Sequence, residues 1–153
     1  MEKPENRETR MTRTFKASIA PMWEVWTNPE HIANWWGPNG FTNTIHKMDF
    51  QEGGEWRLTM RGPDGTSYPN RSIFKEIIPL KKIVFEHFNP HFVTTVLFES
   101  KGQETVIDWS LLFDTAEMCE IVTKTHKADE GQKQNLEKLE KYLSNLLREE
   151  NVE

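Results

Sequence analysis

Acidic and imidazole side chains that fall in segments with strand-like alternation are the residues best suited to chemistry in this sequence. Glu76, His87 and Asp108 lie in three such segments. A carboxylate and an imidazole on one face of a sheet can transfer protons or orient the polar groups of a bound molecule. The same carboxylates can instead form ion pairs with neighbouring arginines and lysines, which is their commoner role. Because Glu76 alternates in phase with the apolar Phe74, we expect it to face the interior.

The motifs of metal centres and covalent catalysis are absent from the sequence. His87 and His91 have the spacing HxxxH, but Pro90 lies between them and prevents the helix that would present both rings to one metal. Neither HExxH nor CxxC occurs. Ser110 lacks the G-x-S-x-G setting of a nucleophile, and the lone Cys119 is flanked by glutamates that would raise its thiol pKa. The sequence therefore predicts no metal, no cofactor and no catalytic nucleophile.

The aromatic residues are the second chemical feature. The chain has six tryptophans and nine phenylalanines against two tyrosines. Side chains of this size fill a core or line an apolar cavity. Adjacent Trp35 and Trp36 cannot point the same way from a helix, where neighbours lie about 100° apart, so we expect one to pack inward and the other to face a cavity. The residues predicted to bind a ligand are Trp35, Trp36, Trp56, Phe74, Glu76, His87 and Asp108.

Length and charge limit the possible classes of protein. The 153 residues suffice for one domain that folds without disulfides or metal. The net charge of −5 argues against a nucleic-acid partner, and no apolar run approaches the roughly 20 residues of a membrane span. One cysteine and a polar N-terminus fit a cytoplasmic protein. We expect a flexible tail over residues 1–10, a single domain over residues 11–148 and an acidic tail over residues 149–153.

Periodicity predicts the elements that must position these side chains. Residues 11–17 alternate like a strand, residues 18–28 repeat apolar side chains at helical spacing, and Pro29 can open a second short helix. Six more strands are predicted over residues 41–50, 56–61, 67–78, 82–88, 92–100 and 103–113. A short helix capped by Asp114 is followed by a long one from about residue 129, whose apolar stripe is Leu136, Leu139, Leu143, Leu146 and Leu147.

This order, β-αα-β6-α, predicts an α+β fold. Strands connected by short turns form one antiparallel sheet, and a helix with a single apolar stripe can cover one face of it. If the sheet of seven strands is curved, the long C-terminal helix over the concave face cannot contact all of it. A cavity surrounded by aromatic side chains would then remain between the two.

Several sequence blocks point to a known family. They are Trp26-Thr27-Asn28-Pro29-Glu30-His31-Ile32, then Trp35-Trp36-Gly37-Pro38, Gly53-Gly54-Glu55-Trp56-Arg57-Leu58, and Gly131 before Leu136-x-x-Leu139-x-x-Tyr142-Leu143. These blocks resemble the START-like (SRPBCC, helix-grip) superfamily, and within it the family named for activators of the 90-kDa heat-shock-protein ATPase. The resemblance covers about residues 12–147 and implies a seven-stranded sheet that grips a long C-terminal helix. It also implies one departure, because the family usually has tryptophan where this chain has Gln132.

The leading functional hypothesis is that the chain binds a small hydrophobic or aromatic molecule between sheet and helix. The resemblance implies a first alternative, an interaction module that acts as a chaperone cofactor. A second alternative is a cyclase-like enzyme that acts on an aromatic substrate through a buried acid–base pair. The sequence leaves open whether the protein is a monomer or a homodimer.

Overall fold

The structure is a computed structural model that describes residues 7–88, 91–125 and 128–150. In chain order its elements are β1 (Glu8–Phe15), α1 (Ile19–Thr27), α2 (Pro29–Ile32), β2 (Thr42–Met48), β3 (Glu55–Arg61), β4 (Ser67–Ile78), β5 (Lys82–Phe88), β6 (Phe92–Lys101), β7 (Glu104–Phe113), α3 (Ala116–Thr125) and α4 (Ala128–Glu150). This order confirms the predicted α+β fold, with two short helices after the first strand and a long helix at the C-terminal end.

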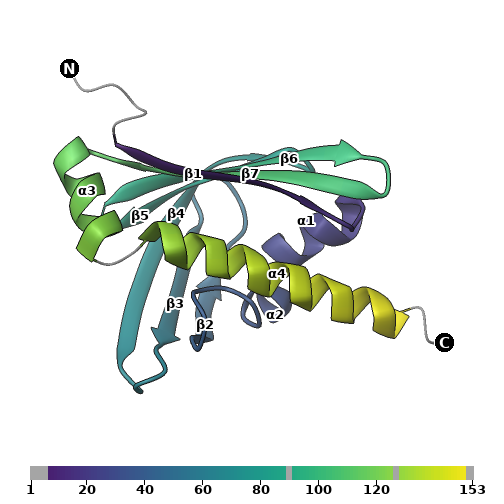
Figure 1. Cartoon of the computed structure of the whole chain (residues 1–153), viewed down its shortest axis with the longest axis horizontal. Coiled ribbons are helices and arrows are strands. Elements are labelled where there is room, and N and C mark those ends of the chain that lie inside the picture. The colour runs from purple at the N-terminus through teal and green to yellow at the C-terminus, as the bar shows by residue number, and fades with distance from the viewer. Residues whose placement is uncertain (1–6, 89–90, 126–127, 151–153) are drawn as a thin grey trace.

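One antiparallel sheet contains all seven strands, in the order β1-β7-β6-β5-β4-β3-β2. The first strand therefore pairs with the last, Met11 opposite Trp109, and α1 and α2 carry the chain to the other edge of the sheet. The sheet is curved, and α4 runs across its concave side (Figure 1). Side chains that alternate toward this side form the core with the helices.

The segment between β1 and β2 is shaped by its proline and by its apolar spacing. Met22, Val25 and Trp26 lie at i, i+3 and i+4 and are the buried residues of α1. Asn28 ends this helix in an extended conformation, because the residue before a proline avoids helical angles. The Asn28 side chain then accepts the backbone N–H of Glu30 and so caps α2.

The C-terminal helix contacts the sheet through the predicted leucine stripe. Leu136, Leu139 and Leu143 are buried, and Leu146 and Leu147 pack against the core at its edge. Burying one such side chain contributes about 1.5–3 kcal/mol to folding. The stripe therefore holds α4 on the sheet.

Element boundaries differ from the prediction at both ends. The sequence predicts a tail over residues 1–10, but β1 begins at Glu8 because Thr9 is buried and its hydroxyl donates to Gln132. Residues 1–6 lie outside the described residues. α4 continues to Glu150, into the predicted acidic tail, and residues 151–153 are again not described. At α3 the cap is Thr115 rather than Asp114, since the Thr115 hydroxyl accepts the Met118 N–H.

The outer face of the sheet is polar and carries a row of cations. Three cations, Lys47, Arg57 and Arg71, lie directly opposite one another on β2, β3 and β4. Like charges in opposite positions repel each other and destabilise the pairing of the strands. Glu55 lies within 2.6–3.8 Å of all three, and the hydrogen bond that it accepts from Arg71 does most to lower the Glu55 pKa.

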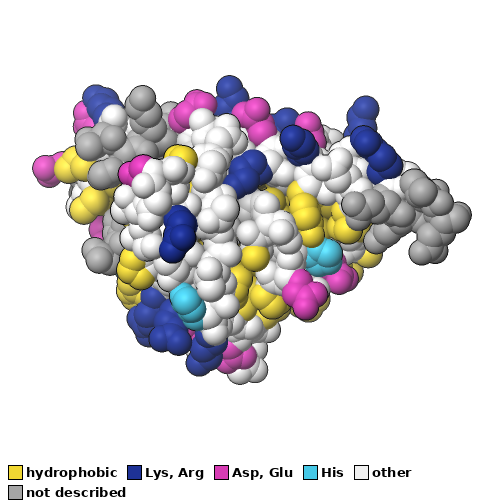
Figure 2. Space-filling model, turned by 90° about the horizontal axis from the view of Figure 1, so that it is seen from below, with side chains coloured by type: hydrophobic (Ala, Val, Ile, Leu, Met, Phe, Trp, Pro, Cys, Tyr) yellow, Lys and Arg dark blue, Asp and Glu magenta, His cyan; other side chains and the backbone are white. Residues whose placement is uncertain are grey.

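Seen from below, lysine and arginine side chains gather at one corner of the molecule (Figure 2). Within the described residues, no helix has the length and apolar character to cross a membrane.

Candidate functional site

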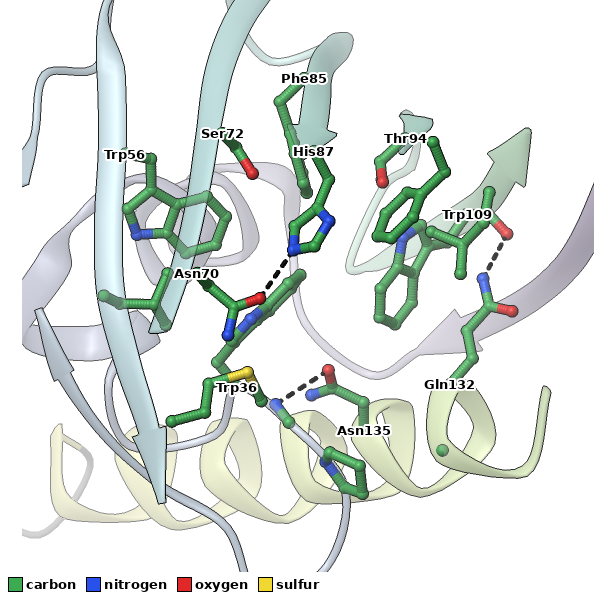
Figure 3. A pocket seen from close by; sticks show the side chains of 17 residues that line it. Trp36, Trp56, Asn70, Ser72, Phe85, His87, Thr94, Trp109, Gln132 and Asn135 are labelled. Carbon is green, nitrogen blue, oxygen red and sulfur yellow. Dashed lines mark hydrogen bonds between the residues drawn. The ribbon is translucent and has the colours of Figure 1, made fainter. Parts of the chain in front are cut away.

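A cavity of about 200 Å³ lies between the concave side of the sheet and α4. Figure 3 shows its walls, to which five strands, α4 and the segment after α2 contribute. The lining residues are Trp36, Gly37, Pro38, Trp56, Leu58, Met60, Asn70, Ser72, Phe85, His87, Phe92, Thr94, Trp109, Leu111, Gly131, Gln132 and Asn135. The strand residues of this set alternate along each strand, which is why they share one face.

Aromatic rings form the innermost part of the wall. The ring centroid of Trp36 lies 5.1 Å from that of Trp56 and 5.6 Å from that of Trp109. Phe85 meets Trp56 edge to face at 5.3 Å. Such distances are those of favourable aromatic pairs in direct contact, so the rings hold one another in place and form one continuous wall beside the cavity. A rigid apolar cavity of this kind favours flat, apolar guests.

The polar groups of the sheet wall come from β4, β5 and β6. His87 Nε2 lies 2.6 Å from Asn70 Oδ1, and the His87 ring stacks on Phe92 with centroids 4.4 Å apart. Figure 3 shows the Asn70–His87 pair directed into the cavity. This pair places one amide and one imidazole beside an otherwise apolar surface.

The α4 wall contains two buried amides whose hydrogen bonds are internal. Asn135 Oδ1 accepts the Gly37 N–H at 3.0 Å, and its Nδ2 donates to the Trp35 carbonyl at 2.7 Å. Gln132 Nε2 donates to the Trp109 carbonyl at 2.9 Å, and its Oε1 accepts the Thr9 hydroxyl. Both side chains are 3% exposed. They therefore join α4 to the first strand, to β7 and to the segment after α2, across the cavity.

Lys138 reinforces the same junction from the next turn of α4. Its Nζ lies 3.2 Å from the carbonyl oxygen of Pro38 and 3.4 Å from those of Trp36 and Phe41. Burial lowers the Lys138 pKa. The segment from Trp36 to Phe41 is thus held against α4 by polar contacts along its length, and it presents Trp36 to the cavity.

Three of the predicted site residues lie in the cavity wall. Trp36, Trp56 and His87 line it, whereas Trp35 and Phe74 lie in the core behind it. Trp35 is fully buried and its indole N–H donates to the Val25 carbonyl at 3.0 Å. The neighbouring tryptophans therefore diverge as expected, one into the core and one to the cavity. That Trp36, Trp56 and His87 bind a ligand stays a prediction.

The predicted inward placement of Glu76 is wrong because of a β-bulge. The register between β4 and β5 shifts between Phe74 and Glu76, so Phe74 lies opposite the buried Phe85 but Glu76 lies opposite Val84. One extra residue reverses the face of every later side chain in the strand. Glu76 consequently lies on the outer face, where it pairs with Lys82 at 2.6 Å.

Asp108 also lies outside the cavity. It alternates with the buried Ile107 and Trp109 along β7, and its carboxylate accepts the Arg10 Nε–H at 2.9 Å on the outer face. Neither predicted carboxylate therefore stands beside His87. The acid–base pair required by the enzymatic alternative is not formed by these residues.

Several wall residues escaped the sequence-based prediction. Trp109 could have been found by alternation, because it lies two residues from Leu111 on the face opposite Asp108. Gln132 and Asn135 precede the leucine stripe at helical spacing, which could have placed them on the buried face of α4. For Thr94 the only signal is its position in the alternation of β6.

Outside the cavity, one histidine connects two carboxylates at the end of the sheet. His91 Nε2 lies 2.7 Å from Glu86 Oε2, and Nδ1 lies 2.9 Å from Asp114 Oδ2. The Glu86 hydrogen bond is the largest effect that raises the His91 pKa, followed among the raising effects by Asp114, while burial opposes both. Lys75 pairs with the other oxygen of Glu86. The next residue, Phe92, belongs to the cavity wall.

These contacts predict a pH dependence of stability. Because the folded-state pKa of His91 is above its ordinary value of 6.5, its stabilisation is complete below that pH and is lost as pH rises through the raised pKa. His91→Gln should therefore lower the melting temperature near pH 6 and leave it nearly unchanged near pH 9, by the same linkage. Thermal melts of both proteins across this range test it, and a constant difference at every pH would contradict it.

Neither a metal centre nor an activated thiol is found among the described residues. No group of three or more His, Cys, Asp or Glu side chains there could hold a metal ion. Cys119 is buried, and burial, followed by the charge of Glu8, raises its thiol pKa. Cys119 is thus a packing residue, as predicted, although Glu8 takes the place of the flanking glutamates as the charge that acts on it.

A curved antiparallel sheet around a long C-terminal helix, with a cavity between them, defines a START-like helix-grip protein, a fold that commonly serves as a ligand-binding scaffold. Residues 16–144 match the family described as activator of Hsp90 ATPase homolog 1-like protein. The chain belongs to this family. Comparison with curated proteins finds no match.

Solved structures from bacteria share the fold. A protein from Arthrobacter aurescens has a TM-score of 0.86 at 22% identity, over 95% of this chain and 90% of that chain. A protein from Mycobacterium smegmatis has a TM-score of 0.84 at 20% identity, over 95% and 96%. The AHSA1 protein from Silicibacter pomeroyi has a TM-score of 0.73 at 18% identity, over 90% and 97%. At these identities the likeness establishes the fold alone.

Proposed function

We propose that this protein binds a small, flat, apolar or aromatic molecule in the cavity between sheet and α4, in the cytoplasm. The observation that carries the proposal is the cavity itself, about 200 Å³ with Trp36, Trp56 and Trp109 around it. An apolar protein cavity of about 150 Å³ is large enough for benzene. The predicted guest is therefore a compound of one ring with a short substituent.

The expected affinity follows from the apolar area that the guest removes from water. An aromatic side chain buries about 150–250 Å², which at about 25 cal/mol per Å² corresponds to roughly 4–6 kcal/mol before the cost of ordering the guest. A dissociation constant of 1 mM corresponds to about 4 kcal/mol. A single-ring probe should thus bind in the high micromolar to millimolar range, and a natural ligand with better contacts should bind more tightly.

The alternatives have less support from the residues. Glu76 and Asp108 lie on the outer face, so the proposed carboxylate partners of His87 are not in the cavity. A role as a chaperone cofactor follows from the name of the family and stays a prediction. Of the three candidate functions, binding of a small molecule has the most support from the arrangement of the side chains.

Filling the cavity should weaken ligand binding strongly without unfolding the protein. Leu111 lines the cavity, and the adjacent Leu112 lies on the other face of β7. Leu111→Trp places an indole in the existing space and should weaken binding of isopropylbenzene at least tenfold, whereas Leu112→Trp should change it less than twofold. Titrations followed by amide chemical shifts of the labelled protein measure both constants.

The design separates binding in the cavity from binding elsewhere. Melting temperatures of the two variants check that both fold. If a folded Leu111→Trp protein binds isopropylbenzene as tightly as the wild type, the cavity is not the binding site and the proposal fails.

A further inference from the structure

Charge is missing from the wall of the cavity. Among the described residues that line it, none is an aspartate, glutamate, lysine or arginine. A buried charge is costly unless a charged or strongly hydrogen-bonding partner accompanies it. The wall therefore disfavours a guest with a carboxylate, phosphate or ammonium group inside the cavity.

The two amide side chains in the α4 wall are not available to hydrogen-bond a guest. Asn135 uses its oxygen for Gly37 and its nitrogen for Trp35, while Gln132 is engaged by Thr9 and Trp109. Breaking these bonds would leave buried backbone groups without partners, at a cost greater than one new hydrogen bond returns. Recognition of a polar group on the guest must come from the sheet.

The sheet wall contains polar atoms that the protein leaves unused. Among the described residues the Thr94 hydroxyl and the indole N–H groups of Trp56 and Trp109 have no hydrogen-bond partner, although all are buried. Thr94 is 0% exposed and lies diagonally across from Trp109, because Trp109 pairs with Val96 two residues along β6. Figure 3 shows the Thr94 hydroxyl directed toward the cavity interior, beside Trp109. Buried polar groups in native proteins nearly always have a partner, so the unpaired Thr94 hydroxyl in the cavity wall indicates a missing acceptor.

We propose that the ligand is an uncharged aromatic compound with a hydrogen-bond-accepting oxygen, such as an aryl carbonyl, and that this oxygen accepts a hydrogen bond from the Thr94 hydroxyl. This inference rests on the proposed function and specifies its ligand class. The ring lies in the cavity against the wall formed by Trp36, Trp56 and Trp109, and the oxygen points toward β6. The Thr94 hydroxyl supplies orientation, while the apolar contacts supply most of the affinity.

Three probes of equal size test the ligand class. Isopropylbenzene, acetophenone and benzoate each place a three-atom substituent on one ring but differ in polarity and charge. One hydrogen bond contributes about 0.5–1.5 kcal/mol, so acetophenone should bind the wild-type protein about two- to twelvefold more tightly than isopropylbenzene. Benzoate should bind at least tenfold more weakly than acetophenone, because the described wall holds no lysine or arginine to pair with its charge.

A pair of matched variants assigns the effect to one hydroxyl. Thr94→Val keeps the shape of the side chain and removes its hydroxyl, and it should abolish or reverse the preference for acetophenone, because the carbonyl oxygen then lacks a partner. Thr95→Val makes the same change at the next residue of β6, which faces the outer side, and should preserve the preference. Amide chemical shift titrations with the three probes give all dissociation constants.

The possible outcomes distinguish a wrong ligand class from a wrong proposed function. If isopropylbenzene binds but acetophenone gains nothing, or if Thr94→Val keeps the preference, the ligand class is wrong while the binding function stands. If benzoate binds most tightly, the inference of an uncharged guest is overturned. If none of the probes binds, the proposed function itself fails. The ranking in the wild-type protein remains decisive should either variant not fold.

Discussion

Replacing Trp35 with alanine should lower the free energy of unfolding by about 3–5 kcal/mol, which is the range observed for large aromatic residues removed from a core. Trp35 is fully buried, meets Trp26 edge to face at a centroid distance of 4.7 Å, and donates its indole N–H to the Val25 carbonyl. The substitution removes these contacts and leaves a carbonyl without its partner. Urea denaturation followed by circular dichroism measures the loss.

The neighbouring tryptophan provides the matched control. Trp36→Ala removes the same side chain from a position that borders an existing cavity, so its cost should be smaller than that of Trp35→Ala. It should also change ligand binding, which a Trp35 substitution affects only through folding. A larger loss of stability at Trp36 than at Trp35 would contradict the division of the pair into a core residue and a wall residue.

Asn135→Ala should lower the free energy of unfolding by about 2–4 kcal/mol. The substitution strands two buried backbone groups, the Gly37 N–H and the Trp35 carbonyl, and each such group costs about 1–3 kcal/mol. The loss should also free the segment after α2 from α4 and so disturb the cavity wall. Urea denaturation gives the energy, and amide hydrogen exchange of Gly37 shows whether its N–H has become unprotected.

Gln134 is the control on the same helix. Its Oε1 accepts the Asn39 N–H at 3.1 Å, but in an exposed position where water can replace it. Gln134→Ala should therefore cost no more than about 1 kcal/mol. If the two substitutions cost the same, burial is not what makes the Asn135 contacts important, and the account of this junction is wrong.

The fold was predictable because its signals are local and repeated. The alternation of β3, the leucine stripe of α4 and the proline that opens α2 each depend on a few neighbouring residues. Together they determine the order of elements, and short turns then require an antiparallel sheet. The sequence blocks around Trp36 and Trp56 resemble a known family, and this resemblance implies the same fold.

The site was less predictable because it depends on irregularities and on distant contacts. The bulge after Phe74 places Glu76 on the outer face, and no residue in that strand signals it. The sequence predicts that Trp35 and Trp36 diverge, but which one is in the core depends on contacts with α1, namely the Trp26 ring and the Val25 carbonyl. The role of Asn135 requires Gly37, which lies 98 residues away in the sequence.

Gln132 stands at a position where the resemblance noted in the sequence implies tryptophan for the family. A tryptophan at this position would extend an aromatic side chain from α4, whereas the Gln132 amide bonds to Thr9 and to the carbonyl of Trp109. The space bounded by Gln132 and Trp109 is part of the cavity.

Crystals of the protein soaked in bromobenzene give the most direct test of ligand binding in the cavity, because the anomalous signal of bromine locates the probe without reference to any variant. We expect one ordered ring in the cavity, against Trp36, Trp56 and Trp109 and with its edge toward Thr94. A cavity that stays empty while bromobenzene occupies other sites in the same crystal would contradict it.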